Sequence, residues 1–81
     1  MRKQLYKVDL WMSDGKNLPI TIATSYIERL PTLVEKNKMY YNRPERQIIG
    51  WDLLDTHPTV NMSQQQYDNE LTYVDVNDEE D

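Results

Sequence analysis

The chain has 81 residues, no cysteine and a formal net charge of −5 at pH 7. This length suits one small domain with a limited core, and the lack of cysteine excludes disulfide bonds and thiolate metal sites. No apolar run approaches the roughly 20 residues that span a bilayer. Residues 1–12 alternate polar and apolar side chains and carry charges, a pattern that is not typical of a signal peptide. We therefore expect a soluble, cytoplasmic protein without a membrane partner.

The charge is divided unevenly along the sequence. Residues 1–50 contain all nine Lys and Arg against five acids, a net of +4, whereas residues 51–81 contain nine acids and no Lys or Arg, a net of −9. An acidic balance by itself mainly aids solubility. Asymmetry between the halves of a chain is the more informative pattern, because it indicates an interaction surface.

Two runs of alternating apolar residues predict an N-terminal β-hairpin, with strands near residues 4–12 and 18–24. Between them, Asp14 and Gly15 provide the positive-φ residues of a tight turn. Alternate residues from Tyr6 to Met12 share the face that we assign to the core. Trp11 lies on the other face, where we expect another element to cover it.

Residues from about 26 to 37 predict one short helix. Ser25 and Glu28 have the spacing of a capping box, in which each side chain bonds a free backbone N–H. Pro31 either kinks this helix or lies in the first turn of a helix that begins near residue 30. The apolar residues share one helical face: Ile27, Leu30, Leu33 and Val34. Residues 38–47 predict a loop.

Two further strands, near residues 47–54 and 70–77, complete the predicted sheet. The first is apolar on both faces, so we expect it to be covered, and Gly50 marks a bulge or a close packing contact. Residues 60–62 would add a short fifth strand, and residues 63–66 predict a turn. In the last strand Val74 and Val76 face the core and Asp75 faces outward.

These elements predict an α+β fold, with one short helix on a mostly antiparallel sheet of four or five strands. The single domain covers residues 1–77. The acids at positions 78–81 repel one another and bury nothing, so they predict a mobile C-terminus.

The sequence offers little for catalysis. The one histidine, His57, precedes a proline in a polar stretch that predicts a loop, and nothing fixes a partner for Asp52 or Asp55 as an acid–base pair. No serine lies in a nucleophile elbow, and two glycines cannot form a phosphate-binding loop. The acids at 78–81 are contiguous, without the glycine turn of a calcium loop. We expect no enzyme activity, no metal and no cofactor.

The acids of the second half predict a partner-binding surface. Alternate residues of a strand lie roughly 6.6 Å apart, close to the spacing of consecutive phosphates in a DNA strand, so carboxylates can imitate a phosphate row. DNA-binding proteins present Lys and Arg to such a row, and no cation follows Arg46 to neutralise the acids. The candidates are Asp52, Asp55, Asp68, Glu70, Asp75, Asp78, Glu79, Glu80 and Asp81. The alternative is a solvated acidic tail without a dedicated role.

In type, the chain resembles the small early proteins with which bacteriophages take over a host cell. The similarity consists of a short cysteine-free α+β chain, an acidic second half and many Tyr, Asn, Asp and Gln residues. Some of these proteins are DNA mimics that inhibit nucleoid-associated proteins, restriction enzymes, CRISPR effectors or polymerases. The resemblance covers the whole chain, without a diagnostic motif. It implies an inhibitor of a basic DNA-binding host protein, for example a nucleoid protein of the HU kind.

Other interactions stay open at this point. Four aromatic residues would instead anchor an interface with a host factor that does not bind DNA: Trp11, Tyr40, Tyr41 and Trp51. Direct nucleic-acid binding by the Lys and Arg of the first half is disfavoured by the overall acidity and by the lack of a binding motif. A small domain with open strand edges could also pair as a two-fold homodimer.

Overall fold

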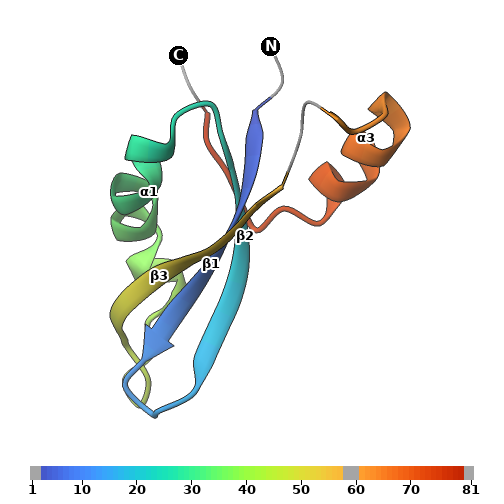
Figure 1. Cartoon of the computed structure of the whole chain (residues 1–81). Helices are drawn as coiled ribbons and strands as arrows, with labels where there is room; N and C mark the ends of the chain where they lie inside the picture. Colours follow the sequence, from blue (N-terminus) through green and yellow to red (C-terminus); the bar gives the residue numbers. More distant parts are fainter. Residues whose placement is uncertain (1–2, 58–60, 80–81) are drawn as a thin grey trace.

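The computed structural model describes residues 3–57, with only the backbone for 55–57, and residues 61–79. It has an α+β architecture, in which a mostly antiparallel four-stranded sheet has the order β3-β1-β2-β4 and carries helices on both faces (Figure 1). The strands are β1 (Gln4–Met12), β2 (Asn17–Thr24), β3 (Ile48–His57) and β4 (Val76–Asn77). The helices are a 3-10 turn η1 (Ile27–Arg29), α1 (Leu30–Lys36), α2 (Lys38–Tyr41) and α3 (Gln64–Thr72). The predicted α+β class is confirmed.

The N-terminal hairpin forms where it was predicted, but of the two predicted positive-φ turn residues, Asp14 and Gly15, only Gly15 has a positive φ. β1 pairs with β2 from Gln4 opposite Thr24 to Trp11 opposite Asn17. Gly15 has a φ of 87°, a conformation that suits glycine in a tight turn. The Asp14 carboxylate accepts a hydrogen bond from the backbone N–H of Lys16 at 2.9 Å and so closes the turn.

β3 pairs antiparallel with the other side of β1, which makes β1 a central strand. The register shifts twice, which leaves Ile49 and Leu54 as the extra residues of two β-bulges. The prediction of a strand at 47–54 is confirmed, but the strand continues to His57. That histidine therefore ends a strand, where a loop was expected.

Most of the core lies between one face of the sheet and α1. The main cluster of buried apolar residues includes Val8 and Ile22 of the sheet and Leu33 of α1. On the opposite face a smaller cluster joins Leu5 and Ala23 to Tyr67 of α3. The two helices therefore cover opposite faces of the sheet, and α3 covers only one end (Figure 1).

The predicted helix at 26–37 is present, but it begins differently. Tyr26 and Arg29 occupy the N-cap positions of η1 and α1, and neither makes a side-chain capping bond, so the expected capping box does not form. Pro31 lies in the first turn of α1, where its missing N–H leaves no helical bond unmade. Residues 38–41, expected as a loop, form α2.

The C-terminal region departs most from the prediction. Residues 64–72 form α3, where a turn and the first half of a strand were expected. Ser63 caps this helix by accepting a hydrogen bond from the N–H of Gln66 at 3.1 Å. Met62 lies just before α3 and not in a strand, and Val60 lies outside the described residues. The last strand shrinks to Val76–Asn77 and runs parallel to β2.

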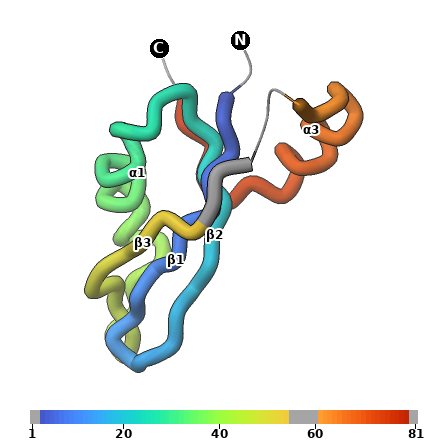
Figure 2. Tube along the Cα trace, viewed as in Figure 1, coloured from blue at the N-terminus to red at the C-terminus, as the bar shows by residue number. Residues whose placement is uncertain are grey.

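The two ends of the described chain meet. The Lys3 ammonium donates to Asn77 Oδ1 at 2.7 Å and also to the backbone carbonyl of Asp78. The first and last described residues accordingly lie at the same end of the molecule (Figure 2). No helix in the described ranges is long and apolar enough to cross a membrane.

Candidate partner-binding surface

One half of the sheet face that α3 occupies is left without a covering helix. We call this surface the open face. The strand register assigns to it the following residues, all exposed or half-buried: Lys7, Asp9, Trp11, Asn17, Pro19, Thr21, Gly50 and Asp52. Trp11 was expected to be covered, but its side chain is 44% exposed. The reason is that α3 packs only over Leu5 and Ala23, at the far end of this face.

Two carboxylates lie directly opposite each other on the open face. Asp9 of β1 pairs in register with Asp52 of β3. Asn17 donates a hydrogen bond to Asp9 Oδ2 at 2.8 Å, whereas the side chain of Asp52 is exposed and makes no hydrogen bond or ion pair with the described residues. Like charges directly opposite on neighbouring strands destabilise a sheet. The pair therefore favours the approach of a cation.

Trp11 lies beside these carboxylates and over a glycine. A Cβ built on Gly50 would come within 2.7 Å of Trp11 Cε3, so the indole packs directly on the Gly50 backbone. This contact confirms the expected close approach at Gly50, whereas the extra residue of the bulge is its neighbour Ile49. An exposed tryptophan held in one position is a typical interface anchor.

Asp78 contradicts the prediction of a mobile, partner-facing terminus. Its side chain is only 2% exposed. Its carboxylate accepts hydrogen bonds from Arg29 Nη2 at 2.9 Å and from Thr24 Oγ1 at 2.8 Å. The hydrogen bond from Arg29 is the main reason that the pKa of Asp78 lies below its usual value, against the opposing effect of burial. Asp78 therefore stabilises the fold and is not available to a partner.

The other C-terminal acids are spread over different elements. Asp68 is exposed on α3, where it accepts a hydrogen bond from Gln64 Nε2 at 2.9 Å, and Glu70 of the same helix is half-buried. Glu79 is exposed at the end of the described chain, and Glu80 and Asp81 lie outside it. The backbone of Asp55 pairs with Lys7 in register, and its side chain is outside the described part.

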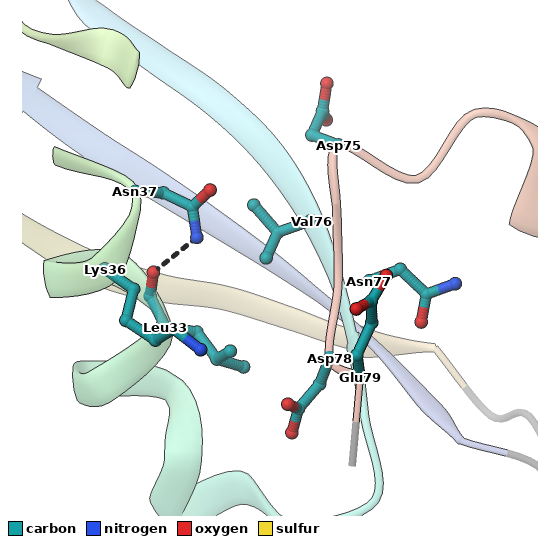
Figure 3. Close-up of a pocket in the computed structure, with 8 residues that line it drawn as sticks. All are labelled: Leu33, Lys36, Asn37, Asp75, Val76, Asn77, Asp78 and Glu79. Atoms are coloured by element: carbon teal, nitrogen blue, oxygen red, sulfur yellow. Dashed lines mark hydrogen bonds between the residues drawn. The ribbon is translucent and has the colours of Figure 1, made fainter. Parts of the chain in front are cut away.

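Asp75 belongs to a polar cavity of about 280 Å³ between the end of α1 and the C-terminal segment (Figure 3). Its Oδ2 accepts a hydrogen bond from the N–H of Thr21 at 2.8 Å. Burial first, and then the negative charge of Asp75, raise the pKa of the Tyr41 hydroxyl. Two of the cavity's three carboxylates, those of Asp75 and Asp78, are thus already engaged by the protein itself. Within the described ranges no three metal-ligating side chains gather.

The four aromatic candidates do not form one patch. Tyr40 and Tyr41 pack edge to face on α2, with ring centroids 5.0 Å apart. Trp51 packs against the main core, on the sheet face opposite to Trp11. Only Trp11 therefore joins the open face.

Sequence reasoning missed three residues, one on the open face and two in the bulges of β3. Asp9 belongs to the cationic half, and only the β1–β3 register shows that it meets Asp52. Ile49 and Leu54, the two bulge residues of β3, are 70% and 55% exposed. The apolar run from 48 to 54 contains both, but the bulges that turn them outward depend on tertiary pairing.

Comparison with known proteins gives no relative from which a role could be carried over. No family model, curated protein or solved structure matches the chain.

Proposed function

We propose that this protein is a non-enzymatic binding protein that occupies the basic surface of a DNA-binding protein. The surface that carries the binding is the open face, with the exposed acids of the second half adding to the field around it. In the setting that the phage-like composition implies, the partner is a cytoplasmic host protein, for example a nucleoid protein of the HU kind, and binding excludes its DNA.

The observation that carries this proposal is the opposition of Asp9 and Asp52 beside Trp11. The two carboxylates repel each other in the free protein, and no cation of the described chain pairs with Asp52. A Lys or Arg of a partner placed between them would relieve this repulsion. Trp11 supplies apolar area, and its ring face can also attract a cation.

The site differs from the row of C-terminal acids that the sequence suggests. Asp78 is buried in its bonds with Arg29 and Thr24, so it adds no exposed charge. Asp52 remains from the original candidates, and Asp9 replaces the terminal acids as its neighbour. Asp68 and Glu79 are exposed and contribute to long-range attraction of a basic partner.

The test is capture from a bacterial lysate by the immobilised full chain. We expect basic DNA-binding proteins to be retained and to be released both by added salt and by short duplex DNA. Capture of proteins that are not basic, or complexes that duplex DNA does not displace, would rule out occupation of a DNA-binding surface.

The site is then tested by removing its charge. The double substitution Asp9→Asn and Asp52→Asn should weaken binding of the captured protein by about tenfold, roughly 1.4 kcal/mol. The matched control removes two exposed acids elsewhere, by Glu28→Gln and Glu45→Gln, and should change binding by less than about twofold. Equal losses in the two variants would show that only net charge matters.

A second candidate function is binding of a partner that does not bind DNA, through apolar contacts. The observation that favours it is the exposure of Trp11 of β1 and of Ile49 and Leu54 of the neighbouring strand β3. Salt separates the two functions, because screening weakens contacts between exposed charges and leaves apolar contacts largely intact.

A further inference from the structure

We propose that the outer edge of β3 binds an extended, Lys- or Arg-rich segment of the partner as an added antiparallel strand. This inference rests on the proposed function, because it names the part of a basic partner that the surface takes. Strand addition supplies affinity through backbone hydrogen bonds and specificity through alternate side chains.

The two edges of the sheet are treated differently. On the β2 side, the short parallel strand β4 pairs with β2, and the carbonyl of Ala23 accepts from the N–H of Asp78. Farther along β2, Thr21 exchanges hydrogen bonds with Asp75, and Pro19 has no N–H to offer. On the other edge, β3 pairs only with β1 among the described residues. Its ten residues contain no Pro, Lys or Arg, which are side chains that often guard an edge strand, and between its two β-bulges the segment 50–53 pairs regularly with β1. The β3 edge is therefore the open one.

The backbone groups that an added strand would meet follow from the register. Thr21 directs its N–H and C=O outward, so its partner in β1, Lys7, and the alternate residue Asp9 direct theirs toward β3. Asp52, opposite Asp9, in turn points its groups toward β1. The neighbours Trp51 and Leu53 therefore point their N–H and C=O groups away from the sheet.

The side chains along this edge define the chemistry of the added segment. Ile49 and Leu54 are both mainly exposed, and along β3 they flank the outward N–H and C=O groups of Trp51 and Leu53. Asp52 lies between them in the strand, and its side chain is on the open face. A segment that alternates apolar and cationic side chains would place its apolar residues near Ile49 and Leu54. Its cationic residues would reach Asp52 and the facing Asp9.

Charge complementarity favours such a segment over a second copy of this chain. Pairing two copies through all the outward groups of Trp51 and Leu53 sets Trp51 of each copy opposite Leu53 of the other. That register places Asp52 directly opposite its own copy, and each chain has a net charge of −5. A basic strand meets the same edge without this repulsion.

The test uses the full chain and a short synthetic peptide of alternating Lys and Val. We expect binding, together with slower hydrogen exchange, by about tenfold or more, at the amides of Trp51 and Leu53. Two control peptides isolate the cause: one carries N-methyl groups on alternate backbone nitrogens, and one has Glu in place of Lys. Both should bind at least about tenfold more weakly.

Matched variants place the peptide on this edge. Ile49→Lys with Leu54→Lys should weaken the peptide by about tenfold, whereas Met39→Lys with Tyr73→Lys adds the same charge at exposed apolar positions elsewhere and should have little effect. Binding of the N-methylated peptide at full strength, or unchanged exchange at Trp51 and Leu53, would overturn strand addition. So would a free protein that is dimeric with these amides already protected.

The outcomes separate this inference from the proposed function. If the peptide fails but basic proteins are still captured through Asp9 and Asp52, strand addition is wrong and the proposed function stands. If the peptide binds the β3 edge but duplex DNA displaces no captured protein, the edge is a binding site for basic strands and DNA mimicry is wrong.

Discussion

At the scale of single residues, Asp78 is the clearest case of a charge that serves the fold. The sequence places it at the start of a run of four acids, which predicts a solvated tail. In the structure its carboxylate is buried between Arg29 and Thr24, and its backbone carbonyl accepts from Lys3. Cations far away in the sequence thus neutralise an acid of the cation-free half, and no local pattern reveals such a contact.

Replacing Asp78 with Asn should lower the free energy of unfolding by about 2 kcal/mol, because Arg29 loses a buried charged acceptor. Urea denaturation measures the change. The neighbouring substitution Glu79→Gln removes the same charge at an exposed position and should change stability by less than about 0.5 kcal/mol. Equal effects of the two substitutions would assign the loss to net charge, against a specific role for the buried carboxylate.

The same contact makes stability depend on pH in the acid range. The pKa of Asp78 in the folded protein lies below the unfolded value of 3.8. A lowered carboxyl pKa contributes its full stability above the unfolded pKa, and this contribution is lost as the pH falls through the folded pKa. The difference in unfolding free energy between the wild type and Asp78→Asn should therefore be constant near neutral pH and shrink below about pH 4. A difference that grows on acidification would contradict this assignment.

At the scale of elements, the sequence predicts those parts whose signals are local. The hairpin follows from alternation and the Asp14–Gly15 turn, and the helix near 26–37 follows from its apolar stripe. α3 escapes this reasoning because its sequence, QQQYDNELT, has few apolar residues. Two signals were nonetheless present: Ser63 and Gln66 have capping-box spacing, and Tyr67 and Leu71 share one helical face.

The N-cap of α3 gives the prediction at this scale. Ser63→Ala removes the oxygen that accepts from the N–H of Gln66 and should cost about 1 kcal/mol. Amide exchange should quicken in the first turn of α3 before it does so in β1. Gln65→Ala is the control, since Gln65 is an exposed residue of the same helix and Ala is the better helix former. A variant at Ser63 with unchanged exchange in α3 would show that packing of Tyr67, and not the cap, holds the helix.

The candidate site was predictable only in part, for reasons of pairing. Asp52 and Trp11 were both identified from the sequence as binding residues, but in two separate hypotheses. The strand order makes β3 the neighbour of β1, and the register of this pair brings them onto one face and sets Asp9 opposite Asp52. Strand order and bulge positions depend on contacts between distant segments, so a single sequence does not specify them.

At the scale of the whole molecule, the two charged halves are neither fully mixed nor fully separated. Arg29 and Lys3 are drawn to Asp78, and Arg46 approaches Asp14 with an N–O distance of 3.1 Å. By contrast, no Lys or Arg of the described residues pairs with Asp52, which faces Asp9 on the open face. The ion pairs of Arg29 and Arg46 are therefore partly buried, whereas the Lys38–Glu35 pair and the Asp52 carboxylate are exposed.

Salt should act on these two sets of charges differently. Dissolved ions screen exposed charges much more than buried pairs, and the screening length is about 10 Å at 0.1 M ionic strength. Added NaCl should therefore raise the free energy of unfolding of the free protein in urea, by about 0.5 kcal/mol, because it relieves repulsion between Asp9 and Asp52 and within the net charge of −5.

The same salt should weaken the complex with a basic partner, so stability and binding respond with opposite signs. This opposition follows from one cause, because the carboxylates that repel one another in the free protein are those that attract the partner. Asp9→Asn with Asp52→Asn should reduce the salt response of stability and that of binding together. Glu28→Gln with Glu45→Gln should leave most of both salt responses unchanged. If salt destabilises the wild-type protein, surface ion pairs outweigh the repulsion. The repulsion between Asp9 and Asp52 would then not account for binding of a basic partner to the open face.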